Sequence, residues 1–87
     1  MSKGRTHLRK EKIMEIAKGV TVDPKVCFGK PVIKGTRISV ELIVGNLAGG
    51  MSFDEIISEY GITKEAILNA LNYASTVLSS EEIRAVG

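Results

Sequence analysis

The apolar residues in the second half of the chain recur at helical spacing. Three helices are predicted, and each follows a residue type that typically caps a helix N-terminus: Ser39, Ser52 and Thr63. Glycines end the first two helices, at residues 49–50 and at Gly61. The third helix is predicted to end near residue 79. Its apolar stripe consists of Ile67, Ala70, Leu71, Ala74, Val77 and Leu78.

Residues 20–38 have a different pattern, with short β-branched runs between turn residues. Two strands are predicted, at Val20–Val22 and Val32–Ile33. The turns at residues 23–24 and 29–31 contain proline or glycine. The two strands therefore predict a hairpin or a small sheet. Because such short strands are marginal alone and an unpaired edge invites another chain, we expect dimerisation through this segment.

The first nineteen residues are basic. They carry six lysines and arginines against two glutamates, a net charge of +4, whereas residues 20–87 sum to −2. A short helix is predicted over residues 7–18, with a thin apolar stripe of Leu8, Ile13 and Ile16, and Gly19 ends it. A basic arm of this kind favours a polyanion or an acidic protein surface; the alternative is a solvated terminus.

Composition narrows the class of protein further. The chain has 87 residues, of which 44% are hydrophobic and 25% charged, which is ordinary for a single globular domain. No apolar run approaches the roughly 18 residues that span a bilayer, and residues 1–12 lack the apolar stretch of a secretory signal. The single cysteine, Cys27, cannot form an internal disulfide. We therefore expect a cytoplasmic protein with no membrane partner.

Catalytic chemistry is poorly represented. His7 is the only histidine, Cys27 has no histidine near it in sequence, and no Cys/His cluster has metal-ligand spacing. The glycine-containing stretch at residues 29–36 lacks the Gly-Lys-Ser/Thr ending of a phosphate loop. We expect a protein that is not an enzyme and holds no cofactor or metal.

Residues 52–78 have the sequence shape of a helix-turn-helix: a helix, a tight glycine turn and a longer helix. On the outer face of the third helix, Asn69 and Asn72 can pair with adenine, and Thr63 and Lys64 can contact phosphate or guanine. These four residues are candidate DNA contacts. The alternative is an α-hairpin of a small bundle, in which the two asparagines only solvate an exposed face.

A second group of cations precedes the first helix. Lys30, Lys34 and Arg37 lie in a segment rich in glycine, where cations and backbone amides can hold DNA phosphates. For Arg37 the alternative is a structural ion pair with an internal acid such as Glu41 or Glu59.

The run from residue 23 to residue 40 resembles the domain-of-unknown-function family 433, which is VapB-type antitoxin-like. The resemblance covers about residues 20–75. It departs from the family at Gly61, where a proline is usual. It implies a homeodomain-like three-helix DNA-binding fold preceded by a small β element, with members often encoded beside toxins that have a PIN nuclease domain. The matching motifs are Gly29-Lys30-Pro31-Val32-Ile33-Lys34-Gly35-Thr36-Arg37-Ile38, Ala48 to Ser52, Glu59-Tyr60, and Ala70 to Ala74.

Together these patterns predict a mostly α fold. Its parts are a basic arm (1–19), a helix-turn-helix domain with an N-terminal β element (20–79) and a short polar tail (80–87). The function predicted is that of a small dimeric DNA-binding protein, an antitoxin-like repressor whose partners are DNA, a PIN-domain toxin and a second copy. The alternative is a protein-binding module or adaptor without DNA affinity. The basic arm suits either the acidic metal site of a PIN nuclease or DNA phosphates.

Overall fold

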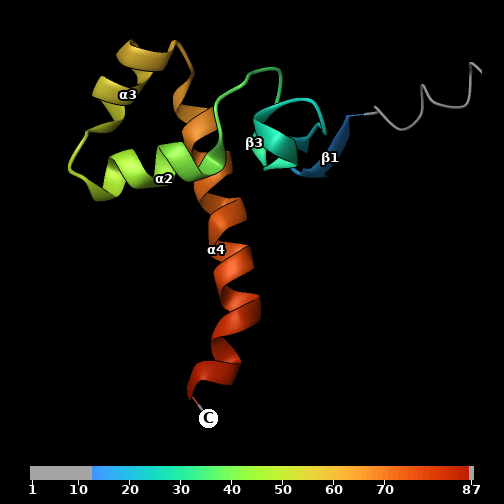
Figure 1. Ribbon diagram of the computed structural model, residues 1–87. Coiled ribbons are helices and arrows are strands. Elements are labelled where there is room, and N and C mark those ends of the chain that lie inside the picture. Colours follow the sequence, from blue (N-terminus) through green and yellow to red (C-terminus); the bar gives the residue numbers. More distant parts are fainter. Residues whose placement is uncertain (1–12, 87) are drawn as a thin grey trace, which may run out of the picture.

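The computed structural model describes residues 13–86, and of these residues 13–80 with their side chains. The described part of the chain forms a small sheet followed by three α-helices (Figure 1). The elements are β1 (Met14–Ala17), β2 (Val20–Val22), the 3-10 turn η2 (Cys27–Gly29), β3 (Val32–Ile33), α2 (Val40–Ala48), α3 (Phe53–Tyr60) and α4 (Lys64–Val86).

Local side-chain chemistry sets the helix starts, as the sequence predicts. The hydroxyl oxygens of Ser39, Ser52 and Thr63 each accept a hydrogen bond from the backbone N–H three residues later, at 3.0, 3.1 and 3.1 Å. The Glu55 carboxylate accepts in return from the Ser52 N–H at 2.8 Å, which completes a capping box. Gly61, at φ 68°, ends α3 in the left-handed conformation.

The sheet is antiparallel with strand order β1-β2-β3. The predicted strands β2 and β3 are confirmed, but β1 replaces part of the helix predicted over residues 7–18; the portion before residue 13 lies outside the described residues. The physical reason lies at Gly19. Its φ of 73° reverses the chain, so that Met14–Ala17 pairs with β2. The thin apolar stripe gave a helix too little surface to bury.

The predicted dimer edge is not open in this sheet. β2 is the central strand, with β1 on one side and β3 on the other. The far side of β3 is also occupied, because Val32 bridges to Ser39 and the Ile33 N–H donates to the Ile38 carbonyl at 2.9 Å. Among the described strands, only β1 has an unpaired edge. Dimerisation through residues 20–38 therefore loses the unpaired edge on which that prediction rested.

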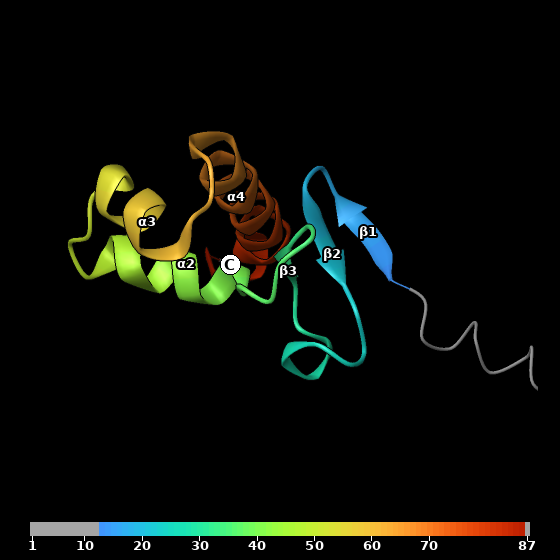
Figure 2. The ribbon, with the colours of Figure 1, turned by 90° about the horizontal axis from the view of Figure 1, so that it is seen from above.

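The hydrophobic core lies where the three helices meet the sheet, and Figure 2 shows the sheet beside α4 with α2 and α3 on the other side. Of the predicted α4 stripe, Ile67 and Ala70 are fully buried, whereas Val77 and Leu78 are exposed. The helix also continues to Val86, so its predicted end near residue 79 is wrong. No glycine or proline interrupts the sequence between Gly61 and the last residue. The buried apolar residues of the core cluster are Val20, Ile33, Val40, Ile43, Ile56, Ile62, Ile67 and Ala70.

The turn η2 has an unusual backbone. Cys27 and Phe28 have φ values of 51° and 58°, a region that side-chain-bearing residues rarely adopt, and Gly29 follows at 79°. The Phe28 side chain is 98% exposed, so no burial compensates for this conformation. The turn therefore stores local backbone strain.

Replacing Phe28 by glycine is expected to stabilise the protein by up to about 1 kcal/mol. The left-handed conformation costs a non-glycine residue about 1–2 kcal/mol, and the added freedom of glycine in the unfolded chain offsets part of that gain. Phe28→Ala is the matched control, because it removes the exposed ring but keeps the Cβ. Urea denaturation should show a higher midpoint for Phe28→Gly alone. An equal gain in both variants would assign the effect to the ring instead.

Candidate functional site

The N-terminus of α4 gathers four of the seven residues predicted to contact DNA. Thr63 caps the helix, Lys64 is its first residue, and Asn69 follows on the side of the sheet. Lys34, from the bend after β3, reaches the same place. We call these four residues, together with Lys18, the α4 N-terminal site. Three of them, Lys34, Thr63 and Asn69, line a small hollow of about 240 Å³ together with Gly19, Ile33, Glu65 and Ala66.

The β1–β2 turn packs directly on α4 at this site. Gly19 lies so close to the helix that a Cβ atom there would overlap the side chain of Asn69. Asn69 is therefore half-buried against the turn, whereas the sequence analysis placed it on the outer face of the helix. The difference follows from β1, which the sequence analysis did not predict. Asn72 is exposed, as expected.

Glu15 holds the turn and the bend together. Its Oε2 accepts from the Gly19 N–H at 3.0 Å, and its Oε1 accepts from the Lys34 Nζ at 3.1 Å. These two contacts, the Gly19 hydrogen bond first, hold the pKa of the Glu15 carboxyl below its ordinary value. The ionised carboxylate thus positions Lys34 beside the α4 N-terminus.

Replacing Lys34 by alanine is expected to raise the pKa of Glu15, but to leave it below the ordinary glutamate value. The Gly19 hydrogen bond, which is the largest single cause of the lowering, survives the substitution. A lowered folded-state pKa stabilises the fold above the ordinary glutamate pKa, and this contribution is lost as the pH falls through the lowered value. NMR titration of the Glu15 carboxyl in the unsubstituted chain and in Lys34→Ala measures the two pKa values. Lys30→Ala is the matched control, and an unchanged Glu15 pKa in Lys34→Ala would contradict the assignment.

The site is only weakly cationic. Lys18 lies 3.9 Å from the Glu65 carboxylate, and both side chains are largely exposed. With Lys34 paired to Glu15, two of the three lysines have an acidic neighbour. Lys64 makes no ion pair within residues 13–80 and is exposed at the helix start. It is therefore the lysine of this site best placed to meet an external anion.

The two other predicted cations lie elsewhere. The Lys30 Nζ donates to the Glu41 Oε1 at 3.2 Å, at the beginning of α2. Arg37 is exposed and makes no ion pair with Glu41 or Glu59 in the described part of the chain. Neither acid named for the alternative is thus its partner among the described residues, and Glu41 pairs with Lys30 instead. The Arg37 carbonyl instead accepts from the Cys27 thiol at 3.3 Å.

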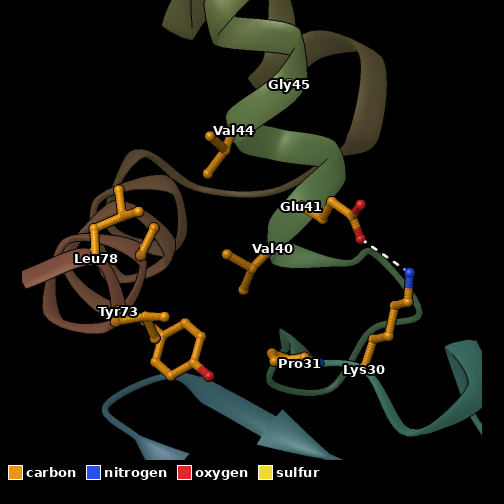
Figure 3. A pocket seen from close by; sticks show the side chains of 10 residues that line it. Lys30, Pro31, Val40, Glu41, Val44, Gly45, Tyr73 and Leu78 are labelled. Atoms are coloured by element: carbon orange, nitrogen blue, oxygen red, sulfur yellow. Dashed lines mark hydrogen bonds and ion pairs between the residues drawn. The ribbon is translucent and has the colours of Figure 1, made fainter. Parts of the chain in front are cut away.

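The sequence analysis missed an apolar groove of about 480 Å³ between the start of α2 and the middle of α4. Figure 3 shows Val40 and Val44 facing Tyr73 and Leu78 across it, with the Lys30–Glu41 pair at its rim. We call it the α2–α4 groove. Its lining residues are Lys30, Pro31, Val40, Glu41, Val44, Gly45, Tyr73, Ala74, Val77 and Leu78. The signal available in the sequence was the absence of charge from residue 66 to residue 80.

Within residues 13–80, no three histidine, cysteine, aspartate or glutamate side chains come together as metal ligands would. Of the helices described, none is both long enough and apolar enough to span a bilayer.

The fold is thus α-rich, with three helices and a small N-terminal antiparallel sheet. Residues 20–74 match the model of the family described as Protein of unknown function (DUF433), and the chain belongs to that family. The resemblance seen in the sequence is confirmed.

Three proteins illustrate the similarity. The chain is 32% identical over 53 residues to a Mycobacterium tuberculosis protein named Putative antitoxin VapB45, across 61% of this chain and 22% of that protein. The crystal structure of Rv2018 from Mycobacterium tuberculosis superposes with a TM-score of 0.55 at 33% identity, over 60% of this chain and 24% of Rv2018. The chain therefore spans less than a quarter of the length of either protein.

The fold extends over nearly the whole chain in a third protein. The crystal structure of a DUF433 member from Anabaena variabilis covers 97% of this chain and 77% of its own, with a TM-score of 0.66 at 21% identity. At this identity the likeness defines the fold alone.

Proposed function

We propose that this chain is an antitoxin-like DNA-binding protein that represses transcription of a toxin–antitoxin pair. In this proposal α3, the turn at Gly61 and α4 act as the helix-turn-helix of a homeodomain-like bundle. The observation that carries it is the exposed N-terminus of α4, where Lys64 begins the helix and Thr63 and Lys34 line the same hollow. The name of the similar mycobacterial protein supports the antitoxin role.

The N-terminus of α4 has the chemistry of a phosphate contact. The first N–H groups of a helix point outward and the helix dipole favours an anion there. Lys34 and Lys64 add two cations to those N–H donors. Phosphate contacts of this kind fix the position of a protein on the duplex without reading its sequence.

In this proposal, residues in the next turns of α4 recognise the DNA bases. Lys64, Leu68 and Asn72 are four residues apart, so they lie along one face, and all three are exposed. In the major groove, Asn72 can pair with an adenine edge, and Leu68 can contact a thymine methyl group. Asn69, held against Gly19, is then a residue that orients the hairpin on the helix.

The proposal is tested by titrating DNA from upstream of the gene with the full chain over a salt series. Lys64→Ala should weaken binding to all sequences and reduce the salt slope by about one. Asn72→Ala should cost about 1–3 kcal/mol at the specific site only. Lys30→Ala is the control, since Lys30 pairs with Glu41 away from this site. If the unsubstituted chain binds DNA and both α4 variants bind it equally well, this surface is not the DNA-binding site.

In this proposal the basic arm binds the toxin. A PIN nuclease site is a cluster of carboxylates, and residues 1–12 carry five cations against one acid. Because Met14–Ala17 belongs to the sheet, a truncation that tests the arm should remove residues 2–12 only. Loss of toxin binding with intact DNA binding supports this assignment, and the reverse outcome makes the arm part of the DNA surface.

A further inference from the structure

The middle of α4, from residue 66 to residue 80, lacks charge, and the last six residues of this stretch are exposed. From Ala66 to Ser80 the helix contains no lysine, arginine, aspartate or glutamate, and every residue from Ser75 to Ser80 is exposed. The solvent-facing side of a helix normally carries charged residues. Depletion of charge is instead the compositional mark of the centre of a protein–protein interface.

Apolar side chains stand on this same part of the helix. Leu78 is 66% exposed and Val77 is 36% exposed. Figure 1 shows the second half of α4 extending away from the other helices and from the sheet. An isolated helical segment of this length is marginal in water, because most helical stability in proteins comes from packing an apolar face.

The α2–α4 groove lies beside this exposed ridge, on the same face. Val77 and Leu78 line the groove. A second hollow, of about 390 Å³, shares the lining residues Val44, Ala74 and Leu78 with it. The small side chains of Ala74, Ser75 and Ser79 leave room for another helix to approach α4 closely. One face of the chain therefore carries both an apolar ridge and the hollow that accepts one.

We infer that a second copy of this chain covers this face, with the two α4 helices antiparallel across a two-fold axis. Such an axis places the same patch of both copies in contact, so the Leu78 ridge of each enters the α2–α4 groove of the other. The contact between the two copies thus covers the apolar ridge of each copy and fills the groove of the other. The inference rests on this face alone and goes beyond the proposed function, since it requires no DNA.

The lack of net charge in the groove favours a second copy of the chain as its occupant over a toxin or a nucleic acid. Of the described side chains that line the groove, only Lys30 and Glu41 are charged, and they neutralise each other at its rim. A surface without free charge offers nothing to the acidic centre of a nuclease or to phosphates, but it matches an identical uncharged surface. Leu78 is fourteen residues from Lys64, about 20 Å along the helix. The dimer therefore leaves the α4 N-terminal site open.

Sedimentation equilibrium of the full chain between micromolar and high micromolar concentration tests the inference. The unsubstituted chain should be dimeric, and Leu78→Glu should raise the dissociation constant roughly 30-fold or more, since it places a charge at the centre of the interface. Leu78 is mostly exposed in one copy, so the variant should keep the helical circular dichroism of the unsubstituted chain. Met14→Glu is the matched control: Met14 is 59% exposed, on the open edge of β1.

A monomeric unsubstituted chain would overturn the inference and leave the groove to a different protein. Dimerisation that survives Leu78→Glu, or that Met14→Glu abolishes, would also overturn it and would favour pairing through β1. DNA titrations keep this result separate from the proposed function. A chain that dimerises through Leu78 but binds no DNA refutes only the repressor role.

Discussion

Replacing Ile67 by alanine is expected to lower the free energy of unfolding by about 2–5 kcal/mol. Ile67 is fully buried and belongs to the core cluster between α4, the other two helices and the sheet. The substitution removes apolar contacts from all of these neighbours and leaves a cavity that they only partly fill. A small domain has a total stability of only about 5–15 kcal/mol, so this loss is a large fraction of it.

The neighbouring residue supplies the control. Leu68 is one position further along α4 and is 44% exposed. Leu68→Ala removes a side chain of similar size from the same helix, and it should change stability by less than about 1 kcal/mol. Urea denaturation followed by circular dichroism gives both values. Equal losses of stability in the two variants would mean that the Ile67 side chain does not point into the core.

Replacing Gly19 by alanine is expected to cost about 2–4 kcal/mol, from two separate causes. The φ of 73° disfavours any residue with a Cβ by about 1–2 kcal/mol. The new Cβ also overlaps the Asn69 side chain, and relieving such an overlap in a packed contact costs about 1–3 kcal/mol. The hairpin should shift away from α4, which would also displace Lys34 from the α4 N-terminal site.

A second glycine separates these two causes. Gly61 has a similar φ of 68°, but no described heavy atom lies within 4 Å of where its Cβ would be. Gly61→Ala therefore measures the conformational cost alone. Adding Asn69→Ala to Gly19→Ala should bring its loss down to that of Gly61→Ala. If Gly19→Ala alone already costs no more than Gly61→Ala, the hairpin does not pack on Asn69.

The helices were predictable because their signals are local. Ser52 and Glu55 are three residues apart, and the capping box they form is visible in the sequence and present in the structure. The strand β1 was not predictable in this way. The contacts that hold the strand's turn in place join Glu15 to Lys34 and Gly19 to Asn69, pairs that are 19 and 50 residues apart. No periodicity within residues 7–18 reports such partners.

The candidate site was predictable only in part for the same reason. Thr63 and Lys64 are placed by the helix start alone, and the sequence located them correctly at the beginning of α4. The orientation of Asn69 depends on the hairpin, and the ion pair of Lys30 depends on how α2 leaves the sheet. The α2–α4 groove also depends on distant residues, since residues 30–45 and 73–78 form it together; only the uncharged stretch of α4 is visible in the sequence.

The central claim is that the first turns of α4 meet DNA while its second half meets a second copy of the chain. The most direct measurement is amide chemical-shift mapping of the full chain as DNA from upstream of the gene is added at low salt. We expect the largest changes at residues 63–72 and at Lys34, with little change at residues 77–80. Changes centred on the α2–α4 groove, or no change at any residue, would contradict this claim.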